Sequence, residues 1–127
     1  MHVRIQQFEE IDAWKMGRQL SVLVYSISGR GEFGRDFGLK DQIRRAAGSV
    51  MHNIAEGFDA ESNREFVRFL GYSKRSCTEV QSQLYVALDQ NYLSQEEFDR
   101  LYSLARQTRG KIKAFMNYLV NFEKKKS

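Results

Sequence analysis

Five polar side chains in the middle of the chain have the types and the spacing of a binding site or of a buried network. Arg45, Ser49, Asn53 and Glu56 recur at steps of four and three residues, so on a helix they form one polar ridge. Glu79, central in the next helical segment, can face this ridge. Because buried charges are normally paired, the first interpretation is a hydrogen-bonded or ion-paired network that fixes the register of the helices. The alternative is an anion or nucleic-acid contact made by Arg45 and the arginine before it.

Cations in the second half of the chain are the other candidates for binding. They are Arg64, Arg68, Arg75, Arg106, Arg109, Lys111 and Lys113. Side chains of this kind bind the phosphates of nucleic acids. The acidic residues of the last segment, at positions 96, 97 and 99, come before its cations, and this order also suits the dipole of a helix. With a net charge of +4, the chain is compatible with nucleic-acid binding without requiring it.

Catalytic and metal-binding patterns are missing from the sequence. Bundles that bind two metals use Glu-x-x-His pairs, and neither His2 nor His52 has a glutamate three positions earlier. Cys77, the one cysteine, falls among apolar positions and is expected to be a buried structural thiol. The glycines of Gly29–Gly34 have the outline of a dinucleotide motif, but they follow a helix where that motif needs a strand. We therefore expect no enzymatic activity, no cofactor and no metal.

Four helices are predicted to position these residues. Apolar residues at steps of three and four indicate helices over about Glu10–Ile27 and Leu39–Glu56. The third helix is expected to begin at Ser62–Glu65 and the fourth at Ser94–Glu97, because both segments match the capping box. Asn91 is the expected end of the third helix. Gly57 stands where a left-handed cap would end the second helix.

Short connections between these helices define the expected topology. They cover Arg30–Gly38, Phe58–Glu61 and Tyr92–Leu93, and short loops make neighbouring helices antiparallel. The sequence therefore predicts one all-α domain over residues 1–127, an up-down-up-down antiparallel four-helix bundle. The absence of proline suits long helices. No apolar run approaches the length of a membrane span, and a single cysteine suits a reducing cytoplasm.

The second predicted helix also carries a family resemblance. Phe37–Val50 and Asn53–Phe58 resemble a bacterial four-helix bundle family whose members are encoded in intervening sequences of large-subunit ribosomal RNA genes. Ala13–Lys15, Glu65–Leu70 and Tyr92–Ser94 extend the resemblance over nearly the whole chain. The resemblance implies a ring-forming bundle, often a homopentamer, without enzymatic activity. Relatives in architecture are accessory proteins of diversity-generating retroelements, which bind nucleic acid and a reverse transcriptase.

Two functions therefore fit the sequence. The first is a non-enzymatic oligomeric scaffold that binds RNA or DNA through basic helix surfaces, with a reverse transcriptase as a possible partner. The second is a protein–protein assembly module with no nucleic-acid role. It is suggested by apolar residues outside the four stripes, since a lone bundle needs fewer of them. These residues are Val22, Tyr25, Met51, Tyr72, Tyr85, Val86, Met116 and Tyr118.

Overall fold

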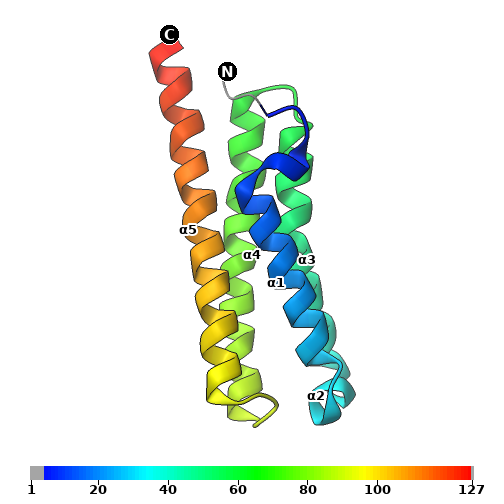
Figure 1. Cartoon of the computed structure of the whole chain (residues 1–127). Helices are drawn as coiled ribbons and strands as arrows, with labels where there is room; N and C mark the ends of the chain where they lie inside the picture. Colours follow the sequence, from blue (N-terminus) through cyan, green and yellow to red (C-terminus); the bar gives the residue numbers. More distant parts are fainter. Residues whose placement is uncertain (1–4, 127) are drawn as a thin grey trace.

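Four long helices lie side by side in the computed structural model, which describes residues 5–126 (Figure 1). The elements in chain order are η1 (Phe8–Glu10), α1 (Asp12–Ser28), α2 (Gly31–Arg35), α3 (Phe37–Phe58), α4 (Asn63–Asp89) and α5 (Gln95–Lys126). Helix α3 packs against α1 and α4, and α5 packs against α4 and α1. The predicted all-α bundle with antiparallel neighbouring helices is confirmed.

The core is built from the apolar stripes that the sequence predicts. Every stripe residue of α3 and α4 is buried, from Leu39 to Ile54 and from Phe66 to Ala87. In α1 and α5, a few residues of the predicted apolar stripes, such as Met16, Leu23 and Phe115, are only partly buried. The packing between α1 and α5 is the most open of the four helix pairs, which agrees with these partly exposed positions.

Helix starts follow local capping chemistry. At the start of α5, the Ser94 hydroxyl accepts from the Glu97 N–H at 3.1 Å and the Glu97 carboxylate accepts from the Ser94 N–H at 2.9 Å. At the start of α4, the Ser62 hydroxyl accepts from the Glu65 N–H at 3.2 Å. The Glu65 carboxylate instead accepts from an arginine one turn on, so only one of the two predicted capping-box bonds forms there.

The connection Arg30–Gly38, expected to be a loop, contains α2 and the first residues of α3. Phe33 in α2 is fully buried, and its ring stacks on Tyr92 with centroids 5.2 Å apart. The Tyr92 hydroxyl donates to Asp36 at 2.9 Å, and Asp36 also caps α3 by accepting from the Leu39 N–H. The hydrogen bond to Asp36 raises the pKa of Tyr92. The α1–α3 connection is therefore fastened to the α4–α5 loop.

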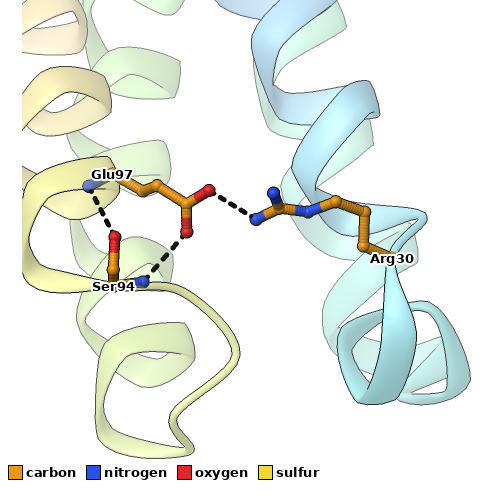
Figure 2. A network of polar contacts seen from close by, with 3 residues as sticks. All are labelled: Arg30, Ser94 and Glu97. Atoms are coloured by element: carbon orange, nitrogen blue, oxygen red, sulfur yellow. Dashed lines mark hydrogen bonds and ion pairs between the residues drawn. The ribbon is translucent and has the colours of Figure 1, made fainter.

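An ion pair makes a second contact at the same end of the bundle, between the α1–α3 connection and the start of α5. Arg30 contacts the Glu97 carboxylate at 2.7 Å, while Glu97 completes the cap of α5 with Ser94 (Figure 2). The Ser94 N–H, and after it Arg30, lower the pKa of Glu97. A lowered pKa in the folded state means that these contacts are intact at neutral pH and weaken as the pH falls through that pKa.

Gly57 corrects one detail of the prediction. It lies inside α3 with a helical backbone rather than in a left-handed cap after the helix. A Cβ atom at this position would be 2.7 Å from Phe66 Cδ1 and 2.9 Å from Phe69 Cβ. The glycine is therefore required by the close approach of α3 and α4. A left-handed residue does follow α4: Asn91 has φ of 61°, at the point where the sequence predicts that this helix stops.

Candidate nucleic-acid interface

Three small polar side chains join α3 to α4. The Asn53 amide donates to the Ser49 carbonyl and to the Ser49 hydroxyl, both at 2.9 Å. The Ser76 hydroxyl of α4 donates to the Ser49 hydroxyl, also at 2.9 Å. Deeper in the core, Ser73 donates to the Val50 carbonyl at 2.6 Å. The uncharged part of the predicted polar ridge is therefore a hydrogen-bonded contact between two helices.

The charged members of the ridge do not form the buried network that the spacing suggests. Arg45 pairs with Asp41 on its own helix at 3.0 Å, and the arginine side chain is 80% exposed. Glu56 and Glu79 are exposed as well. Arg45, Ser49 and Glu79 border one shallow depression of about 220 Å³. The expectation of buried charge pairs is wrong, because these long side chains start beside the core stripe and extend into water.

Two substitutions one turn apart on α3 distinguish the hydrogen-bonded side chains of the ridge from the exposed charged ones. Asn53→Asp replaces an amide donor by a carboxylate facing the Ser49 carbonyl, so we expect a loss of about 1–3 kcal/mol of unfolding free energy. Glu56→Gln changes an exposed group of the same shape and is expected to stay within about 0.5 kcal/mol of the wild type. Urea unfolding measures both. An equal loss in the two variants would show that Glu56 does belong to the network.

Arg44 is committed to packing rather than to a ligand. Its Nε donates to the Ser28 hydroxyl at 2.8 Å, and its Nη2 donates to the Tyr25 carbonyl at 3.2 Å. Its guanidinium lies 4.4 Å from the centroid of the Tyr25 ring. The arginine therefore sits at the C-terminal end of α1, where a cation is favoured by the helix dipole. The alternative interpretation, in which Arg44 contacts an external anion, has no support in this arrangement.

The candidate cations gather on the surface shared by α4 and α5. Arg109 donates from α5 to the Thr78 hydroxyl of α4 at 3.1 Å, which fixes the facing register of the two helices. Arg75 precedes Thr78 by three residues, and Arg106 and Lys113 are three before and four after Arg109, so all lie on this surface. We call this set, together with its neighbour Lys74, the basic strip: Lys74, Arg75, Arg106, Arg109 and Lys113.

The other predicted cations lie apart from the basic strip. Lys111 is two residues from Lys113 and therefore about 200° away around the helix. It borders a depression on the α1 side together with Glu10 and Asp12. Arg68 pairs with Glu65 at 2.8 Å and lies over the rings of two neighbouring aromatic residues of its own helix. Arg64 is exposed in the first turn of α4, beyond the end of the strip.

Carboxylates are sparse around the basic strip, and Glu79, four residues after Arg75, is the nearest one on α4. The sequence has no aspartate or glutamate from Phe66 to Thr78 in α4 or from Arg100 to Phe122 in α5. Cations without neutralising partners on one surface produce a positive potential that attracts polyanions. The helix dipole does not account for the cations of α5, because its effect falls off within the first and last turns of a helix and Arg106, Arg109 and Lys113 lie in the interior of α5. It gives no advantage to Arg64 or Arg75, which lie in the first half of α4.

Cys77 lies beneath the basic strip. Its side chain is fully buried. Burial raises the pKa of the Cys77 thiol to about 12, and Arg109 offsets part of this rise. The protonated thiol is not a nucleophile at neutral pH, which agrees with the predicted structural role. Within residues 5–126, no group of three or more His, Cys, Asp and Glu side chains is placed to hold a metal ion.

A groove between α1 and α5 is the second notable surface. It has a volume of about 990 Å³ and its lining is mainly apolar, including Trp14, Met16, Leu23 and Leu104. Val22 at its border is 61% exposed. Exposed apolar surface of this kind marks interaction sites in soluble proteins. No helix of the described chain is long and apolar enough to cross a membrane.

Two groups of residues on the α4–α5 surface are not among the sequence-based candidates for binding. Lys74 belongs to the basic strip. The sequence feature that could have identified it is its place beside Arg75 in a segment without acidic residues. The aromatic residues Tyr85 and Tyr102 extend the same surface, and the sequence marks Tyr85 only as a surplus apolar position. The pairing of α4 with α5 is predictable, but the facing register that groups these residues follows from the three-dimensional packing.

The fold and these surfaces define a class of protein: a small four-helix bundle with a basic surface on one helix pair and an apolar groove on another. A family model for the 23S rRNA-intervening sequence protein matches residues 9–114. The chain belongs to this family, and the resemblance drawn from the second helix is confirmed. The matched segment contains the whole basic strip.

A solved structure shares the fold. The crystal structure of a protein with unknown function from the S23 ribosomal protein family of Bacteroides thetaiotaomicron VPI-5482 superposes with a TM-score of 0.76. The similarity covers 82% of this chain and 97% of that one at 17% sequence identity, so it concerns the fold alone. A search of curated proteins gives no match.

Proposed function

We propose that the chain is a non-enzymatic, oligomeric scaffold that binds nucleic acid through the basic strip of α4 and α5. The observation that carries this proposal is the set of five cations on one surface, whose α5 segment has no carboxylate and whose α4 segment has Glu79 as its nearest one. Because log affinity for a polyanion depends on the number of phosphates neutralised, a single strip gives modest and sequence-tolerant binding. Several strips in one oligomer raise the affinity by avidity without any new contact.

Self-assembly into a ring, most simply a homopentamer as the family resemblance implies, is part of the proposal. The apolar groove between α1 and α5 supports an interface there, because its lining is apolar and Val22 beside it is exposed. This groove lies on a different side of α5 from Arg106 and Lys113. A neighbour bound in the groove therefore leaves the basic strip accessible. An accessory role beside a nucleic-acid-processing enzyme such as a reverse transcriptase fits this arrangement.

An electrophoretic shift series tests the proposal. Structured RNA, single-stranded DNA and duplex DNA are each titrated with the protein at low and at high salt, and light scattering gives the mass of the particle. We expect binding at low salt that weakens steeply as salt rises, by a particle larger than one chain. No binding of any of these probes at low salt would reject the proposed function.

The second candidate is a protein–protein assembly module, which the same apolar groove favours. An oligomer or a protein complex that forms through α1 and α5 while nucleic acid is ignored would support this function instead. The two candidate functions therefore differ in whether the protein binds nucleic acid in a salt-dependent way, and not in whether it assembles.

A further inference from the structure

An aromatic cluster stands at one end of the basic strip. Tyr85 of α4 packs against Phe98 and Tyr102 of α5, with ring centroids 4.8 Å and 5.6 Å away. Phe98 and Tyr102 stack with centroids 5.3 Å apart. Since Phe98 is buried, the cluster is anchored in the core and holds the Tyr85 ring in place. A ring that is already ordered loses little conformational entropy when it binds a ligand.

Tyr85 differs from the other exposed tyrosines in what covers its ring. Half of Tyr85 is exposed. The guanidinium of Arg44 covers Tyr25 at 4.4 Å, and the guanidinium of Arg68 lies 6.0 Å from the centroid of Tyr72. Within residues 5–126, no cation covers Tyr85, and its ring contacts are with aromatic side chains. Its π surface is therefore available to an external partner.

The cluster is in line with the cations. Tyr102, Arg106, Arg109 and Lys113 follow one another on α5 at steps of four, three and four residues, so they share one side of the helix. The row is about 16 Å long at 1.5 Å per residue. A row of cations with an exposed aromatic ring at its end is a combination that suits single strands, because cations hold the phosphates and aromatic rings stack on the bases.

Two carboxylates mark the end of this row. Asp89 follows Tyr85 by four residues and Asp99 precedes Tyr102 by three, and both are exposed. A phosphodiester chain is repelled at that point, whereas a neutral base is not. Tyr85 itself adds no negative charge at neutral pH, because a phenol is protonated there and the neighbouring Tyr102 raises its pKa further. A bound strand therefore runs from Lys113 toward Tyr85 and leaves the surface there.

We infer that Tyr85, supported by Tyr102, is a stacking platform for an unpaired base at the end of a single strand whose phosphates lie on the basic strip. The inference rests on the proposed nucleic-acid binding and names its ligand class: single-stranded nucleic acid. In the interior of a duplex the bases are stacked and paired, so their faces cannot reach a ring on a helix surface. The ring therefore gives single strands an advantage that the cations alone do not.

Tyr85→Leu and Tyr85→Phe form the matched pair that tests this inference. Both keep an apolar side chain, but only phenylalanine keeps the ring. The probes are short unstructured RNA and DNA strands with 2-aminopurine at one end, and a closed circular duplex, which has no exposed terminal base pair. We expect Tyr85→Leu to weaken single-strand binding by about 5- to 150-fold. We also expect it to abolish the fluorescence quenching of the terminal base and to leave the salt dependence unchanged, because no phosphate contact is lost. Tyr85→Phe should bind like the wild type.

Each contrary result has a distinct meaning. If the wild type binds and Tyr85→Leu binds single strands equally well, the platform is wrong while the proposed function stands. If the wild type binds no probe at low salt, the proposed function fails and this inference fails with it. A change in particle mass in Tyr85→Leu would assign this surface to a contact between subunits and would also overturn the inference. Comparison of RNA with DNA shows whether the sugar contributes to binding.

Discussion

Gly57→Val is expected to destabilise the bundle by about 3 kcal/mol, because the substituted side chain collides with a neighbouring helix. The Cβ atom alone would lie 2.7 Å from Phe66 Cδ1 and 2.9 Å from Phe69 Cβ. The Phe66 ring can rotate away, but the Phe69 Cβ is fixed to the backbone of α4. The two helices must therefore move apart, and the γ methyl groups of valine increase that separation. For a domain with about 5–15 kcal/mol of total stability, such a loss is severe.

Gly57→Ala sets two effects against each other. Alanine is favoured over glycine in a helix interior by about 1 kcal/mol, whereas overpacking costs about 1–3 kcal/mol. We expect the collision with Phe69 to prevail and the variant to lose about 1 kcal/mol. Chemical denaturation of the two Gly57 variants measures these losses.

Gly110 in α5 is the matched control. It is also a helical glycine, but a Cβ atom there would meet nothing within 4 Å. Gly110→Ala should therefore stabilise the protein by about 1 kcal/mol, and Gly110→Val should change it only slightly. Equal gains for alanine at both positions would show that α3 and α4 do not approach each other at Gly57.

The contrast between these glycines shows where sequence-based reasoning stops. The four helical stripes are predictable, because burial on one side of a helix imposes a period of 3.6 residues. The reason for Gly57 is not, because it depends on Phe66 and Phe69 of another helix. Phe33 escapes prediction for the same reason. Its short helix has no periodic pattern, and its burial depends on Tyr92, far along the chain.

The candidate site divides in a similar way. Periodicity places Arg45, Ser49, Asn53 and Glu56 on one ridge. It cannot show that Asn53 bonds to Ser49, that Ser49 bonds across to Ser76 of α4, or that the long side chains reach water. Sequence also identifies the cations of α5 without separating Lys111 from Lys113. Residues that are two positions apart on a helix point about 200° away from each other, so Lys113 lies beside α4 and Lys111 beside α1. The neighbouring helices, rather than the residue types, decide which cations act together.

Replacing Arg106, Arg109 and Lys113 together by glutamine is expected to weaken single-strand binding by about 100-fold at about 0.1 M salt. Each phosphate contact on a single strand contributes about 0.7 to the slope of log affinity against log salt. The loss of three contacts therefore lowers the slope by about 2, which corresponds to the stated loss relative to about 1 M salt. Fluorescence anisotropy across a range of salt concentrations measures this slope, and light scattering and a thermal melt check assembly and folding.

A triple variant of equal charge change separates the strip from the total charge. Arg35→Gln, Arg45→Gln and Lys111→Gln remove three exposed cations from α2, from α3 and from the α1 side of α5. If binding depends on the surface of α4 and α5, this variant keeps a slope close to that of the wild type. If it flattens the slope as much as the strip variant does, attraction is set by net charge alone. An unchanged slope in the strip variant would place the contact on another surface of the bundle. Because the strip and the groove lie on different sides of α5, the strip variant should lose nucleic acid while its particle mass stays the same.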